Sequence, residues 1–176
     1  LDFLDHFKFK TTFTFDYTSR DSRLFTPIAY VYNPELNGKE NLSEREVIRQ
    51  EKNHDLTAMS DYILTYQNQF GKHGLTATAG ITTRYNEFSG LDGSRSQHID
   101  NITFPIPNDN PDKWWLTSLG NNAMQNGGSQ WKRFTMSYLL RGLYNYENKY
   151  LVNLSYRRDG SSVFRGSGKT WGNFYS

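Results

Sequence analysis

The chain of 176 residues contains no cysteine and no long run of apolar residues. Without cysteine it has no disulfides and no thiolate ligands for a metal. Without a run of about 18 apolar residues it has no segment that would cross a membrane as a helix. The net charge is only +2, and lysine and arginine do not cluster, so the composition does not indicate binding of nucleic acid.

Aromatic residues are abundant, at 16% of the chain, and most of them lie in stretches that alternate apolar and polar residues. The apolar rows are Phe7, Phe9, Phe13, Phe15 and Tyr17; Leu56, Ala58, Tyr62, Leu64, Tyr66 and Phe70; Leu75, Ala77, Ala79, Ile81 and Tyr85; Phe134, Met136, Tyr138, Leu140, Tyr144 and Tyr146; and Tyr150, Val152, Leu154 and Tyr156. Successive side chains of a strand point to opposite faces, so each stretch has one apolar and one polar face. Strands of this kind form the wall between lipid and a polar lumen.

The sequence therefore predicts an all-β fold, a segment of an antiparallel transmembrane β-barrel. The whole chain, 1–176, is expected to be part of one barrel domain. Five strands are expected, followed by the start of a sixth near the C-terminus; the five cover about 4–17, 53–70, 75–87, 134–146 and 150–158. The first four are longer than the roughly 9–11 residues that cross a bilayer, so some strands are expected to rise above the membrane.

The connections alternate between short and very long, which orients the wall. Two long segments, about 18–52 and 88–133, are expected to be extracellular loops, and the short turns to be periplasmic, because bacterial barrels show this asymmetry. Residues paired directly across a hairpin must point to the same face of the sheet. This rule predicts a four-residue loop, Gly71–Gly74, and a three-residue loop, Glu147–Lys149. In the second of these, Asn148 tolerates the left-handed region best, although the usual placement would favour Lys149.

Three short sequences predict local structure. Ser43 to Glu46 is either a capping box that opens a short helix or the extension of a strand, with a slight preference for the strand. The dipeptides Asp92-Gly93 and Asp159-Gly160 indicate turns.

The C-terminal part carries an ordered series of aromatic, charged and small residues. Its members are Tyr144, Tyr146, Lys149 and Tyr150; Arg157, Asp159, Gly160, Ser161, Ser162 and Phe164; and Trp171, Gly172 and Phe174. The series resembles the barrel signature of the SusC/RagA-type TonB-dependent outer-membrane transporters, with Tyr175 where that family usually has proline and Val163 where it often has a basic residue. The resemblance extends to Leu64–Tyr66 and Phe70–His73.

The resemblance implies a plugged barrel of about 22 strands, of which this chain would supply part. It implies an outer-membrane nutrient importer that takes up oligosaccharides or peptides. The expected partners are a SusD-like surface lipoprotein acting as a lid, the TonB system, the lipid bilayer and the substrate, and no nucleic acid. No signal peptide opens the chain, so it is expected to be an internal piece of a longer protein.

Nothing in the sequence predicts catalysis, so the protein is expected not to be an enzyme and to hold no cofactor. The four histidines are scattered and show no metal-ligand spacing. Trp114 and Trp115 are the candidate ligand-binding residues, because flat rings stack on apolar sugar faces; the alternative is that both pack the loop against the barrel rim or a partner. The signature residues are expected to be structural, with Arg157 and Asp159 pinning the strand end to a neighbouring strand or loop.

Two other functions remain open on the sequence. A soluble β-sandwich that binds carbohydrate also alternates, although its strands are shorter and its apolar face is a mixed aliphatic core. A surface adhesin or autotransporter barrel would lack the C-terminal series.

Overall fold

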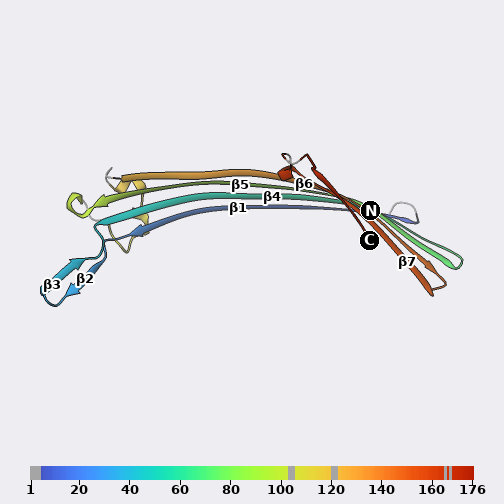
Figure 1. The fold of residues 1–176 in the computed structure, drawn as a ribbon, viewed down its shortest axis with the longest axis horizontal. Helices are drawn as coiled ribbons and strands as arrows, with labels where there is room; N and C mark the ends of the chain where they lie inside the picture. Colours follow the sequence, from blue (N-terminus) through green and yellow to red (C-terminus); the bar gives the residue numbers. More distant parts are fainter. Residues whose placement is uncertain (1–4, 103–105, 120–122, 165, 167) are drawn as a thin grey trace. The chain divides into compact units, whose positions relative to one another are not determined.

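The computed structural model describes residues 5–102, 106–119, 123–164, 166 and 168–176. One antiparallel sheet dominates it, with the strand order β1-β4-β5-β6-β7-β8. Its long strands β1, β4, β5 and β6 run alongside one another (Figure 1). Its strands are β1 (Phe7–Thr26), β4 (Arg45–Phe70), β5 (His73–His98), β6 (Ala123–Tyr146), β7 (Tyr150–Ser161) and β8 (Trp171–Tyr175). A separate hairpin pairs β2 (Tyr30–Asn33) with β3 (Gly38–Asn41). Single 3-10 turns are η1 (Ile99–Asn101), η2 (Pro111–Lys113), η3 (Leu116–Ser118) and η4 (Ser162–Phe164).

The contacts divide the chain into two compact units. Unit 1 comprises Leu1–Tyr17, Asp55–Glu87 and Trp131–Ser176, and unit 2 comprises Thr18–His54 and Phe88–Gln130. Within the described part of the chain, no helix is long and apolar enough to span a membrane.

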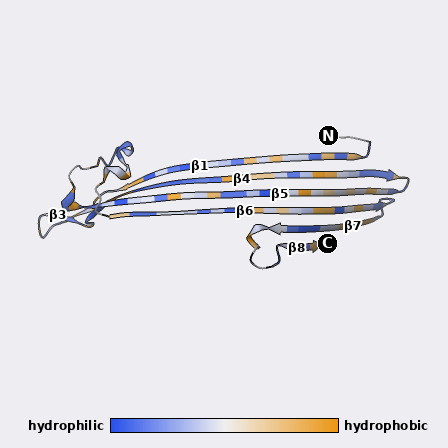
Figure 2. Cartoon of the chain, turned by 90° about the horizontal axis from the view of Figure 1, so that it is seen from above, coloured by the Kyte–Doolittle hydropathy of each residue, from blue (hydrophilic) through white to orange (hydrophobic). Residues whose placement is uncertain are grey.

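Unit 1 is a single-layered sheet with one apolar and one polar face. Large apolar side chains of the predicted rows lie uncovered, among them Phe13 at 69% and Phe15 at 73% exposure. Rings pair across the strands on this face, with centroids 5.8 Å apart for Phe13 and Tyr62. Figure 2 shows orange residues distributed along β4 and β5 toward the hairpin that joins them. The predicted fold class, all-β with the alternation of a transmembrane β-barrel wall, is confirmed, and the exposed aromatic rows argue against the dry core of a β-sandwich.

The length of unit 1 matches the thickness of a bilayer. On β5 it runs from His73 to Glu87, which is 14 residue steps of about 3.3 Å, or roughly 46 Å along the strand. At a strand tilt of about 40° this corresponds to roughly 35 Å along the membrane normal. The hydrocarbon core measures about 30 Å and the whole bilayer about 40–45 Å, so unit 1 is long enough to span the core and part of both interfaces.

A pair of hydroxyl groups lies on the apolar face of unit 1, between β4 and β5. Ser60 and Thr83 have the parity of the apolar rows, and their hydroxyl oxygens lie 2.6 Å apart in a hydrogen bond. Because an unpaired hydroxyl is costly in an apolar medium, each residue makes the other tolerable there.

The strands are longer than the sequence predicts, and they take up part of both predicted loops. The bounds 4–17, 53–70, 75–87 and 134–146 fall short of β1, β4, β5 and β6, which extend through much of 18–52 and 88–133; for the first strand, residue 4 lies outside the described residues. Alternation fades beyond about Tyr17 and Glu87, where unit 2 begins. We attribute the fading to the loss of lipid on one face: the backbone ladder continues, while buried apolar side chains are confined to the small cluster around Phe25 and Ile48.

The β6–β7 hairpin has the predicted register. Tyr146 pairs with Tyr150, which leaves Glu147–Lys149 as the loop. The positive φ values belong to Glu147 (50°) and Asn148 (56°). Asn148 therefore adopts the left-handed conformation as expected, and Glu147, rather than Lys149, shares it.

The β4–β5 hairpin is tighter than predicted. β4 ends at Phe70 and β5 begins at His73, so the loop has two residues, not the four of Gly71–Gly74. Gly71 has a φ of 58°, and glycine at the first loop position is what a type II′ turn requires. Face matching permits either loop length, because both lengths leave residues of one face paired.

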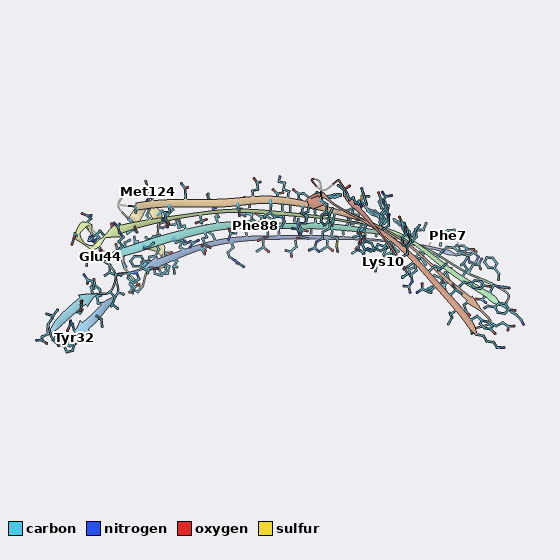
Figure 3. The ribbon with its side chains drawn as sticks, viewed as in Figure 1. Phe7, Lys10, Tyr32, Glu44, Phe88 and Met124 are labelled. Atoms are coloured by element: carbon cyan, nitrogen blue, oxygen red, sulfur yellow. The ribbon has the colours of Figure 1, made fainter. Side chains whose placement is uncertain are left out.

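Unit 2 has a small core of its own. Phe25 from β1, Ile48 from β4 and Leu119 form a buried cluster, against which Ile106, Trp114 and Leu116 pack. The segment Ser43–Glu46 enters β4 at Arg45, as the strand alternative predicted, and Ser43 Oγ accepts a hydrogen bond from the Ala29 amide (2.9 Å). The β2–β3 hairpin, which carries Tyr32 in Figure 3, was not predicted.

Candidate functional site

The polar face of unit 1 is cross-linked by side chains of neighbouring strands. Thr82 Oγ1 donates to the Asp61 carboxylate (2.6 Å), which joins β5 to β4. Arg141 Nε donates to Asn153 Oδ1 (3.3 Å), which joins β6 to β7. This face therefore offers hydroxyl, amide and charged groups that are already held in place by the sheet.

A cavity of about 450 Å³ lies on the polar face where β6, β7 and β8 adjoin. Its polar lining includes Thr135, Ser137, Arg157, Asp159 and Lys169, and the aromatic residues Phe164, Trp171 and Phe174 also line it. Arg157 Nε lies 2.7 Å from Asp159 Oδ1, and both side chains are partly exposed. Such a cavity presents donors and acceptors together, which suits a polar, hydrogen-bonding ligand.

Arg157 and Asp159 were expected to pin the strand end to a neighbouring strand or loop. Their bond instead runs within β7, between residues two apart on one face. In the register of β7 with β8, Arg157 lies opposite Phe174 and Asp159 opposite Gly172. Pinning stays a prediction for this pair.

The first part of the signature surrounds the β6–β7 hairpin. The hydroxyl of Tyr144 lies 2.6 Å from His73 Nδ1, and the rings of Tyr146 and Tyr150 stack with centroids 6.5 Å apart. Lys149 Nζ lies 3.8 Å from the Glu147 carboxylate. These contacts support a structural role, which stays a prediction.

The second part of the signature connects β7 to β8. Gly160 lies opposite Trp171, and a Cβ atom on Gly160 would lie 2.7 Å from the Trp171 ring. The Trp171 ring stacks on Tyr138 (5.7 Å between centroids), and the Arg158 guanidinium lies 5.1 Å from its centre. Asp159-Gly160 is therefore strand, not the predicted turn; glycine is needed there because a ring covers the backbone.

The remaining signature residues lie around the end of β7. The Phe134 amide donates to Ser162 Oγ (2.9 Å), and the Ser161 amide donates to the Thr170 carbonyl oxygen (3.1 Å). Phe164 is 55% exposed.

The two candidate tryptophans have different environments. Trp114 packs beside Phe25 with centroids 6.0 Å apart, and its Nε1 donates to the Pro107 carbonyl oxygen (3.0 Å). Trp115 is 48% exposed, and the Arg23 guanidinium lies 4.2 Å from its ring centre. The geometry favours the packing alternative for Trp114 and leaves ligand stacking as a prediction for Trp115.

A polar cavity of unit 2 escaped the sequence analysis. It has a volume of about 520 Å³ and is lined by Arg49, Asp92, Ser94, Met124, Gln125 and Asn126. Arg49 lies 2.8 Å from Glu51 and 3.7 Å from Asp92. The pattern Arg49-Gln50-Glu51 was the available signal, and it lay in a segment expected to be loop.

Asp92-Gly93 was expected to be a turn and is instead in the interior of β5. A Cβ atom on Gly93 would lie 3.0 Å from Leu116 Cδ1. Glycine lets residues of the 106–119 segment approach the strand, which explains the dipeptide without a turn. Across the described residues no group of three or more His, Asp or Glu side chains could hold a metal ion.

Comparison with known proteins gives related receptors and transporters. No protein-family profile matches the chain. The chain is 29% identical over 170 residues to TonB-dependent receptor P39 and 25% identical over 171 residues to TonB-dependent receptor P3, both of Formosa agariphila (strain DSM 15362 / KCTC 12365 / LMG 23005 / KMM 3901 / M-2Alg 35-1). The alignments cover 94% and 96% of this chain but only 14% and 15% of those receptors.

Solved structures of the RagAB system share the fold. The structure of the RagAB peptide transporter matches this chain with a TM-score of 0.76 at 18% identity. The match covers 98% of this chain and 17% of the transporter chain. The RagAB peptide importer in the "closed-closed" state matches with a TM-score of 0.77, also at 18% identity. That match covers 99% of this chain and 18% of the importer chain. The predicted resemblance to SusC/RagA-type TonB-dependent transporters, of which this chain corresponds to a piece of the barrel, is confirmed.

Proposed function

We propose that this segment of a TonB-dependent barrel wall belongs to a nutrient importer of the outer membrane, which takes up oligosaccharides or peptides with a surface lipoprotein as its lid. One observation carries the proposal: unit 1 is a single layer with an uncovered aromatic face and a hydrogen-bonded polar face, of bilayer thickness. Only a wall between lipid and an aqueous lumen places both faces in a suitable medium. The proposal also rests on the relatives being TonB-dependent receptors.

The polar face is suited to guiding a hydrogen-bonding substrate. The cavity beside β8 combines the Arg157–Asp159 pair with hydroxyl groups, so it can donate to carbonyl or hydroxyl oxygens and accept from amide or hydroxyl hydrogens. Peptides and oligosaccharides both carry these groups. The solved neighbours are described as peptide transporters, and this favours peptides as the first substrates to test.

The lid and the energy source follow from the resemblance. In this proposal the extracellular side is unit 2, whose β2–β3 hairpin exposes Tyr30 at 55% and Tyr32 at 60%. A SusD-like lipoprotein would contact this side, and the TonB system would act on parts of the full-length protein that lie outside this chain.

The test uses the full-length protein in its own host. Cells with and without the gene are given fluorescent peptides and fluorescent oligosaccharides of matched length, and uptake is measured with and without TonB. The proposal expects uptake that requires both the gene and TonB, and a full-length protein in the outer-membrane fraction whose gel mobility changes on boiling. Full-length protein recovered from the soluble fraction without detergent would overturn it.

A further inference from the structure

The apolar face of unit 1 is not uniform, because a groove of about 440 Å³ crosses it. Ala77 and Ala79 supply small side chains there and Gly142 supplies none, between the larger Tyr66, Leu154 and Tyr156. Gly142 lies opposite Leu154 in the β6–β7 register. A Cβ atom on Gly142 would meet nothing within 4 Å, so the groove is open space and not a close approach of two backbones.

Two neighbouring turns of unit 1 form a basic surface, the hairpin patch, made of Lys72, His73, Tyr144, Glu147 and Lys149. The Glu147 amide donates to the Lys72 carbonyl oxygen (2.9 Å), which ties the β6–β7 turn to the β4–β5 turn. Both lysines contact the single Glu147 carboxylate. Two positive charges against one negative charge leave the three groups at +1, and the two lysine side chains are 69% and 72% exposed.

Aromatic and imidazole groups connect the hairpin patch to the apolar face. His73 Nδ1 shares a hydrogen bond with the Tyr144 hydroxyl (2.6 Å), and its ring lies 5.0 Å from that of Tyr146. Tyr144 and Tyr146 belong to the apolar row that also contains Leu140, a residue lining the groove. Rings with one polar end are typical of the level where hydrocarbon meets headgroups.

The spacing suits one amphiphilic ligand. Ala77 lies four residues beyond His73 on β5, a distance of about 13 Å along the strand. A headgroup at the turns would therefore place its hydrocarbon chains in the groove. We propose that the hairpin patch and the groove together bind one anionic phospholipid, with its phosphate at Lys72 and Lys149 and an acyl chain over Gly142. This inference rests on the proposed function, because it needs the short turns to lie at a membrane surface.

Charge decides between a lipid and a second copy of the chain. A second copy seated symmetrically on the groove would bring its own patch of charge +1 against the first, which is unfavourable. An anionic phosphate complements the two exposed lysines. Each lysine near an anionic membrane surface strengthens binding to that surface about fivefold.

The experiment uses the full-length transporter in nanodiscs of equal parts phosphatidylglycerol and phosphatidylcholine. Native mass spectrometry then counts the lipids that remain bound. Wild type is expected to retain one phosphatidylglycerol in preference to phosphatidylcholine. Gly142→Leu, which fills open space and so permits folding, is expected to lower retention of that lipid at least fivefold. Lys72→Gln with Lys149→Gln is expected to remove the preference between the two lipids.

The controls are Ile81→Leu, which changes the apolar face outside the groove, and Lys39→Gln in unit 2; both are expected to behave as wild type. Equal retention of the two lipids by wild type, or unchanged retention in Gly142→Leu, would overturn the inference. A wild-type dimer that Gly142→Leu converts to monomer, with lipid retention unchanged, would assign the groove to a second copy instead. Failure of the proposed function is read separately, from uptake by cells with and without the gene and from recovery of the full-length protein in the soluble fraction, whereas lipid retention is read in nanodiscs.

Discussion

A cation placed on the apolar face at mid-height should destabilise the barrel far more than the same cation one residue further along. The hydrogen bond between Ser60 and Thr83 places these two residues opposite each other in the pairing of β4 with β5. Counting four residues on from that pair places Leu64 opposite Ala79, near the middle of unit 1. Thr65, the next residue of β4, has the parity of the polar face. Leu64→Arg and Thr65→Arg therefore form a matched pair with the same incoming side chain.

The magnitude follows from the position. Arginine on the lipid face at the midplane of a barrel costs about 2–4 kcal/mol, which lowers the ratio of folded to unfolded protein roughly 30- to 700-fold. Leu64 is already 36% exposed on its face, so the cost comes from the charge in lipid and not from a lost dry core. Arginine at position 65 meets water and should change stability by about 0.5 kcal/mol or less.

The assay compares full-length variants folded into lipid vesicles. Urea unfolding followed by tryptophan fluorescence gives the free energy, and the gel shift on boiling gives the folded fraction independently. The reasoning would be refuted if Thr65→Arg were as costly as Leu64→Arg, or if Leu64→Arg were tolerated without loss.

Three further predictions concern other parts of the chain. Trp114→Ala should cost about 2–3 kcal/mol of local stability, because it leaves a gap beside the buried cluster of unit 2, and hydrogen exchange of 106–119 should accelerate. Trp115→Ala should leave hydrogen exchange unchanged and lower substrate affinity. If substrate affinity were unchanged, Trp115 would not be a ligand contact. Ser60→Ala should cost about 1 kcal/mol in vesicle unfolding, and adding Thr83→Val should recover most of it, because the double variant leaves no unpaired hydroxyl; additive losses would contradict this. Gly71→Ala should cost about 1 kcal/mol in the same assay, since φ is 58° there, and a neutral result would argue against a rigid turn.

Alternation predicted unit 1 well because one physical cause acts on every residue of it. Lipid on one face and water on the other impose period two on β1, β4, β5, β6 and β7, and the pairing of Tyr146 with Tyr150 follows from matching faces. The same logic predicted a four-residue β4–β5 loop and was wrong, since it constrains parity and leaves the length of the loop open. The left-handed Gly71 decides it.

Unit 2 was less predictable because its strands lack such a cause. Asp92 and Gly93 looked like a turn, and the strand around them becomes visible only through the ladder it forms and the packing of Leu116 on Gly93. Trp114 was one of two equal candidates until its ring was placed beside Phe25. The Arg49–Asp92 contact joins residues 43 positions apart, which no local pattern reveals.

The central claim is that one face of unit 1 meets lipid and the other meets water. This segment has no cysteine, so each thiol introduced along β5 from Leu75 to Glu87 is the segment's only one. Spin labels on the full-length protein in vesicles would then be tested for access to oxygen, which concentrates in lipid, and to a water-soluble nickel complex. The account predicts strict alternation, with odd positions accessible to oxygen and even positions to nickel. Access that does not alternate, or that favours nickel at Ala77, Ala79 and Ile81, would contradict it.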